Sequence, residues 1–144
     1  MKKETLLLIV LGLLALGGGA AVVSSGVADY IVKKISEAIA FAEGFYVPGS
    51  IPQRFNNPGD LTRDLTGKAV GQYGMYMVYG TPEDGWEALY KQVRLMFGGS
   101  RIYNPLMTIA DVARSYTATE QTAWARNVAA HLGVSVNTKL SEIV

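Results

Sequence analysis

An uncharged stretch from Thr5 to Ala28 divides this 144-residue chain into two unequal parts. As a helix, its 24 residues would extend about 36 Å, which exceeds the thickness of a bilayer's hydrocarbon core, about 30 Å. Two lysines precede the stretch and small residues end it, so an N-terminal secretory signal is the alternative interpretation. We predict an anchor at residues 1–28, with one transmembrane helix that crosses a lipid membrane through residues 5–28, followed by one domain at residues 29–144.

The charge and composition of the remaining chain exclude several classes of protein. Eleven basic and eleven acidic side chains follow residue 28, so this part is neutral and lacks the excess positive charge typical of nucleic-acid binding. The chain has no cysteine and one histidine, which excludes disulfides, thiolate chemistry and a zinc site with the usual ligands. We therefore predict no nucleic-acid partner, no metal and no cofactor.

Apolar periodicity predicts a mainly α domain. Asp29 is the expected N-cap of a first helix that ends at Gly44, with one apolar face. Three further helices are expected to begin at threonine caps, namely Thr81, Thr108 and Thr119. The apolar face of the first helix consists of Ile31, Ile35, Ala38, Ile39 and Ala42.

A long loop separates the first two predicted helices. Residues 45–81 show no helical periodicity, and loops of this length are usually functional. Within it, residues 68–79 alternate enough to predict a short hairpin that turns near Gly71 or Gly74. The tail after Gly133 is expected to add one short helical turn.

Glu43 stands out as a candidate catalytic acid. It lies in the last turn of the first helix, at the edge of the apolar face and beside aromatic residues. Partial burial and the negative end of the helix dipole both disfavour a carboxylate, so the pKa of Glu43 should be raised. A carboxylic acid that is still protonated near neutral pH can protonate a glycosidic oxygen.

Four short motifs follow in a fixed order: Glu43-Gly44-Phe45, then RFNNPGDL at 54–61, GQYG at 71–74 and TPEDGWEAL at 81–89. This series resembles the lysozyme-like lytic transglycosylases of bacteriophages, and the resemblance covers residues 36–134. It departs from that family's pattern at residues 117–119, where Thr-Ala-Thr replaces a stretch that often contains proline.

The resemblance implies an α+β lysozyme-like fold and assigns roles to named residues. Glu43 would be the catalytic acid and then the base. The residues implied to line the glycan cleft and bind substrate are Asn56, Asn57, Gln72, Tyr73 and Tyr116. A structural role is an alternative for each of these five: a turn at the asparagines, hairpin packing for Gln72 and Tyr73, and core packing for Tyr116.

The number of acids bears on the type of reaction. Hydrolysis by either common glycosidase route needs two carboxyl groups flanking the bond. Besides Glu43, the loop offers Asp60 and Asp64, neither in a context that predicts a shifted pKa, and Asp60 is the candidate second carboxylate. A single acid fits a non-hydrolytic route better, in which the muramoyl 6-hydroxyl attacks and a 1,6-anhydro product forms.

These inferences predict a membrane-anchored lytic transglycosylase that acts on peptidoglycan strands and opens the wall locally while a phage genome enters or leaves the cell. The expected location is the membrane of a lipid-containing virion, or the host inner membrane with the domain facing the wall. Two alternatives stay open. One is a non-enzymatic virion protein that binds glycan or other virion proteins, and the other is a secreted hydrolytic endolysin.

Overall fold

The computed structural model of the protein describes residues 26–144, so most of the predicted anchor at residues 1–28 lies outside the described residues. Within residues 26–144, no helix is long and apolar enough to cross a bilayer. Helices dominate the described part, and a two-stranded sheet follows the first of them, as predicted. The elements are α2 (Asp29–Glu43), α3 (Ile51–Arg54), β1 (Ala69–Tyr73), β2 (Tyr76–Tyr79), α4 (Pro82–Phe97), α5 (Ile109–Tyr116), α6 (Gln121–Leu132) and the 3-10 turn η2 (Leu140–Glu142).

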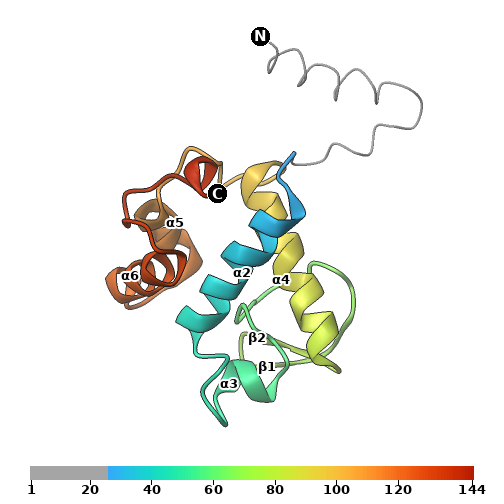
Figure 1. Cartoon of the computed structure of the whole chain (residues 1–144). Helices are drawn as coiled ribbons and strands as arrows, with labels where there is room; N and C mark the ends of the chain where they lie inside the picture. The colour runs from blue at the N-terminus through green and yellow to red at the C-terminus, as the bar shows by residue number, and fades with distance from the viewer. Residues whose placement is uncertain (1–25) are drawn as a thin grey trace, which may run out of the picture.

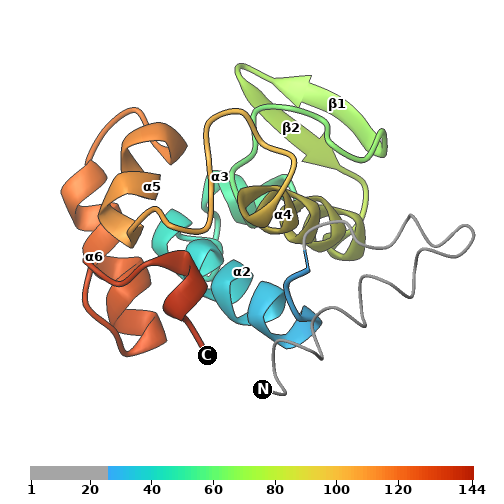
Figure 2. The same cartoon turned by 90° about the horizontal axis from the view of Figure 1, so that it is seen from above.

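Helix α2 is the centre of the domain. It packs against α6 on one side and α4 on the other, and α5 packs against α6 (Figure 1). Seen from above, the α5–α6 pair and the hairpin lie on opposite sides of the molecule, with α2 and α4 between them (Figure 2). A group at the end of α2 therefore lies close both to the α5–α6 pair and to the hairpin.

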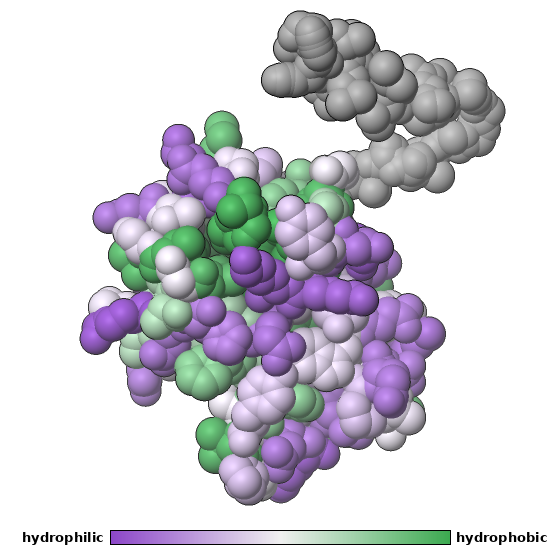
Figure 3. Space-filling model, viewed as in Figure 1, coloured by the Kyte–Doolittle hydropathy of each residue, from purple (hydrophilic) through white to green (hydrophobic). Residues whose placement is uncertain are grey.

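The apolar face predicted for α2 forms the middle of the core. Ile31, Ile35, Ala38 and Ile39 are all buried, which confirms the predicted periodicity. Outside the core, hydrophilic residues cover much of the face seen in Figure 1, and hydrophobic ones gather mainly on its upper half (Figure 3).

The helix starts follow local capping chemistry with two exceptions. The hydroxyls of Thr81 and Thr108 cap α4 and α5, as predicted. Asp29 is instead the first residue of α2, where its carboxylate pairs with Arg94. The prediction of Thr119 as the cap of α6 is wrong, because the next residue, Glu120, takes a left-handed φ of 51° and the helix begins after it.

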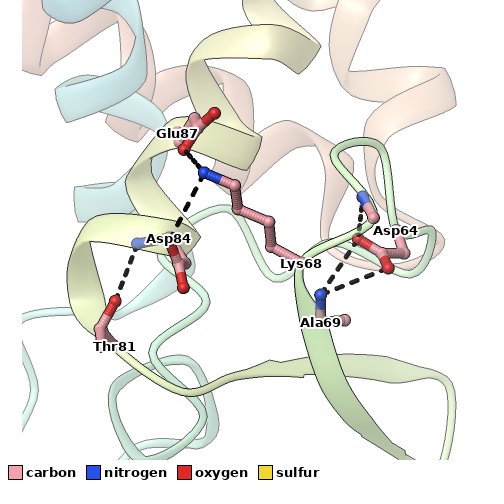
Figure 4. Close-up of polar contacts among 7 residues, drawn as sticks. Asp64, Lys68, Ala69, Thr81, Asp84 and Glu87 are labelled. Atoms are coloured by element: carbon pink, nitrogen blue, oxygen red, sulfur yellow. Dashed lines mark hydrogen bonds and ion pairs between the residues drawn. The ribbon is translucent and has the colours of Figure 1, made fainter.

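The hairpin forms where it was predicted, and Gly74, with a φ of 62°, is in its turn. Polar contacts fix the chain that leads into it (Figure 4). The Asp64 carboxylate accepts hydrogen bonds from the Ala69 N–H. Lys68 Nζ lies 2.8 Å from a Glu87 carboxylate oxygen and 4.0 Å from one of Asp84, both on α4. Asp64 therefore serves the structure of its own loop.

Candidate active site

Glu43 is the last residue of α2, and its carboxyl group meets α6. Gly44, with a φ of 84°, ends the helix directly after it, and the Phe45 N–H donates to the Ala40 carbonyl. Oε2 of Glu43 accepts a hydrogen bond of 2.8 Å from Nε1 of Trp124, which is 6% exposed. Because α2 and α6 pack along each other, this bond holds the carboxyl group at the edge of the core.

The loop after α3 is built on Asn57, which is fully buried. Its side-chain amide donates to the carbonyl oxygens of Leu61 and Met77, and its Oδ1 accepts from the Leu61 N–H. This burial and these hydrogen bonds favour the turn alternative for Asn57 over contact with substrate. Its hydrogen bonds tie the loop to β2, and so it determines where Asp60 lies.

Tyr116, at the end of α5, supports the same loop from the other side. Its hydroxyl donates a hydrogen bond of 2.8 Å to the Gly59 carbonyl, and its ring stacks on Trp124 with centroids 5.0 Å apart. The stacked pair therefore supports both acidic residues. Trp124 hydrogen-bonds to Glu43, and Tyr116 hydrogen-bonds to Gly59, the residue before Asp60. This position favours the core-packing alternative for Tyr116.

The carboxyl groups of Glu43 and Asp60 lie within hydrogen-bonding distance of each other. Burial, and next the negative charge of Asp60, raise the pKa of Glu43 to about 8. Burial also raises the pKa of Asp60, to about 6, although its hydrogen bond with Glu43 acts in the opposite direction. The expectation that the context of Asp60 shifts no pKa is wrong, because tertiary contacts bury it.

The pair therefore shares one proton across the neutral pH range. No N–H or O–H group among residues 26–144 donates to Oδ1 of Asp60, which is buried. A protonated Glu43 can supply the missing donor, with Asp60 as the ionised acceptor. In the apo protein, this arrangement keeps the proton on Glu43.

An open cavity of about 240 Å³ lies in front of this pair. Tyr76 of β2 borders it, and the charges of Asp60 and Glu43 both raise the pKa of its hydroxyl. On the opposite side, the cavity is bordered by the α5–α6 connection and by α6, through Thr117, Thr119, Glu120, Trp124 and Asn127. The site therefore offers a proton donor, several hydroxyls and an amide around a space open to solvent.

Three other predicted residues lie away from this cavity. Nδ2 of Asn56 donates to the Tyr79 carbonyl and thereby joins the loop to β2. Gln72 donates within the hairpin turn, and Tyr73 packs its exposed ring against Phe55. None of the three borders the cavity that holds Glu43, whereas Tyr76, two residues beyond the predicted motif, does.

Sequence reasoning missed Trp124 as a member of the site. Its place on an apolar face predicts a core residue, and it is one, but its indole N–H also needs an acceptor when buried. The need for an acceptor could have indicated that Trp124 contacts a polar group of the site. Glu120 and Asn127 gave no such indication, because exposed polar residues are common on helices and in loops.

Comparisons of the chain with protein-family models, curated proteins and solved structures find no match. Among residues 26–144, no group of three or more histidine, cysteine, aspartate or glutamate side chains is placed to hold a metal ion. The case for a function thus rests on the geometry around Glu43.

Replacing Trp124 with phenylalanine is expected to slow the proton transfers predicted for Glu43 and to change the pH dependence of the rate. The indole N–H stabilises the ionised carboxylate, so its loss should raise the pKa of Glu43 further and move the alkaline limb of activity to higher pH. A hydrogen bond to a charged group contributes about 1.5–3 kcal/mol, which predicts a rate roughly 10- to 100-fold lower.

For the peptidoglycan cleavage that the sequence predicts, the measurement is the rate from about pH 5 to pH 10. Trp86→Phe is the matched control, since Trp86 packs on Phe45 and Tyr90 and does not border the cavity. An alkaline limb that stays in place in Trp124→Phe would contradict the assigned role of the indole.

Proposed function

We propose that the protein is a peptidoglycan lytic transglycosylase with a lysozyme-like domain, cleaving the β-1,4 bond between N-acetylmuramic acid and N-acetylglucosamine. The observation that carries this proposal is the buried carboxyl group of Glu43, which lies beside Asp60 at the edge of an open cavity. Burial and a neighbouring carboxylate keep Glu43 protonated near neutral pH, as a general acid requires.

The distance between the two carboxyl groups favours the non-hydrolytic route. Retaining glycosidases hold their two carboxyl groups about 5–5.5 Å apart, and inverting ones about 6.5–9.5 Å. Glu43 and Asp60 interact through a hydrogen bond, which favours a pair that acts as one group over two groups that flank a bond. Such a pair works as one acid whose proton is held ready by its neighbour.

The reaction then needs only Glu43 to touch the reacting atoms. Its proton passes to the glycosidic oxygen as the bond to the muramoyl C1 breaks, and the N-acetyl group of the substrate stabilises the positive centre. Glu43, now a carboxylate held by Trp124, takes the proton of the muramoyl 6-hydroxyl. That oxygen bonds to C1, which gives the 1,6-anhydro ring and returns the acid without water.

A second candidate is ordinary hydrolysis, and one observation favours it. Glu120 borders the same cavity from the α5–α6 connection, across from α2. A carboxylate in that position could activate water or stabilise the positive centre. In this case the Glu43–Asp60 pair would still supply the proton.

The products of peptidoglycan cleavage distinguish the two candidates. The full chain, purified in mild detergent, is incubated with peptidoglycan and the products are identified by mass spectrometry. We expect anhydro-muropeptides, with Glu120→Gln giving the same products. Reducing-end products that carry an added water and disappear in Glu120→Gln would establish hydrolysis. Glycan binding with no product would favour a non-enzymatic module.

The proposed setting is a membrane. We propose that residues 5–28 hold the enzyme in a virion membrane or in the host inner membrane, where it opens the wall locally as a phage genome enters or leaves. A chain held in this way reaches only the wall next to its own bilayer.

A further inference from the structure

A second cavity, of about 170 Å³, adjoins the first one at Asp60, which borders both. It lies between the loop that follows Gly59, the middle of α4, and the chain around Tyr103. We call it the side pocket and define it by Asp60, Arg63, Gln92, Ile102, Tyr103 and Ser115. Asp60 therefore forms part of the wall of both spaces.

Gln92 gives the side pocket an unused hydrogen-bonding group. The residue lies on α4 and is only 9% exposed, yet its side-chain amide forms no hydrogen bond with any of residues 26–144. Its amide atoms are not buried, so they can reach the open space of the side pocket. Because Gln92 borders the side pocket, its amide can both donate to and accept from a ligand there.

Arg63 gives the same pocket an unpaired positive charge. Its guanidinium forms no ion pair with an acidic side chain in the described part of the chain, and the residue is exposed at the rim. Tyr103, which is 8% exposed, borders the same pocket, and the charge of Arg63 partly offsets the rise that burial causes in the pKa of its hydroxyl. Ile102, 57% exposed, adds an apolar contact.

This combination selects a particular chemistry. The amide of Gln92 inside the pocket can pair with another amide, and the guanidinium of Arg63 at the rim can pair with a carboxylate. Ile102 can pack against a small aliphatic group. A short peptide that ends in a carboxylate carries all three. A bare sugar has no carboxylate for Arg63 and leaves Gln92 only hydroxyls.

We propose that the side pocket binds the peptide substituent of the glycan strand, with Gln92 pairing to a peptide amide and Arg63 to a carboxylate. This inference rests on the proposed function, since it places the peptide beside the bond at Glu43. It makes the enzyme selective for strands that carry peptides over strands from which the peptides have been removed.

Two substrates and one ligand test this inference. The full chain in detergent is assayed on peptide-bearing strands and on strands stripped of peptides by an amidase. Binding of muramoyl dipeptide is measured separately with Glu43→Gln, which lacks the acid. The variants are Arg63→Ala and Gln92→Leu, and the control is Arg126→Ala, an exposed arginine on α6 that borders neither cavity.

We expect Arg63→Ala to raise KM on peptide-bearing strands about tenfold and to leave KM on stripped strands unchanged. Muramoyl dipeptide should bind about tenfold more weakly when Arg63→Ala or Gln92→Leu is added to Glu43→Gln. Equal KM values on both substrates in the wild type, with no change in Arg63→Ala, would overturn the inference while leaving the proposed function intact.

Failure of the proposed function gives a different result. If no variant cleaves either substrate, the binding experiment alone decides. Muramoyl dipeptide binding that depends on Arg63 would then support the side pocket as a peptide site, and binding that ignores Arg63 would overturn it.

Discussion

Glu43→Gln is expected to lower kcat for glycan cleavage by about 10³- to 10⁴-fold, because in the proposed reaction one residue supplies both the acid and the base. General acid–base catalysis contributes about 10²–10⁴ in rate, and here both proton transfers are lost together. Glutamine keeps the shape of the site, since its oxygen can accept from Trp124 and its N–H can donate to Asp60.

The same substitution is expected to stabilise the fold at alkaline pH. The pKa of Glu43 is about 8 when folded and near 4.5 when unfolded, so ionisation costs stability progressively between those two values. The stability that Glu43 contributes is therefore fully present below about pH 4.5 and is lost as the pH rises to about 8. Glutamine carries no such cost, and we expect about 2 to 4 kcal/mol of added stability at about pH 9.

Thermal unfolding at about pH 4.5 and pH 9, beside kcat at neutral pH, checks both parts. Glu37→Gln is the matched control, because Glu37 also lies on α2 but accepts a hydrogen bond from Tyr46 and does not border the cavity. Full activity in Glu43→Gln would remove Glu43 from catalysis. Equal Tm values at pH 9 would show instead that its carboxyl is not held in a buried, protonated state.

Gly85→Ala is expected to cost at least about 4 kcal/mol of stability and to impair cleavage as a consequence. Gly85 lies buried in the first turn of α4, where a Cβ would sit 1.7 Å from the Asn56 carbonyl oxygen and 2.8 Å from its carbonyl carbon. Both are backbone atoms, so no side-chain rotation relieves the clash. The loop that carries Asn57 and Asp60 must move away from α4.

Gly71→Ala is the control, since a Cβ there meets no atom within 4 Å and the strand backbone suits alanine. Chemical denaturation measures the loss of stability, and cleavage is measured below the unfolding transition. A Gly85→Ala protein that unfolds like the wild type would mean that the loop and α4 do not approach as closely as described.

The elements that the sequence predicted are those whose signals are local. The N-caps Thr81 and Thr108 and the glycine that ends α2 act through residues within one or two turns, so reading along the chain finds them. The start of α6 was misplaced because Glu120 adopts a left-handed conformation, which a threonine before a helix does not indicate.

Sequence reasoning identified two residues of the site, Glu43 and Asp60, but not the contacts that hold them. Glu43 carries its own local signals, a helix end and aromatic neighbours. Its partner Trp124 is 81 positions away in sequence, and the burial of Asp60 depends on packing against other elements, so neither contact follows from spacing alone. The motif identified Asn57 as a residue of this loop, but a short motif does not reveal which amide is buried.

The length of helix α2 determines how far the proposed site lies from the proposed anchor. The helix begins at Asp29, close to the start of the described chain, and ends at Glu43. Its 15 residues extend about 22 Å at 1.5 Å per residue. For a domain held in a bilayer as we propose, the length of α2 therefore sets the separation between Asp29 and Glu43. The distance along the helix from its first residue to the proposed proton donor is about 22 Å, so the proposed site lies close to the residue at which the domain follows the proposed anchor.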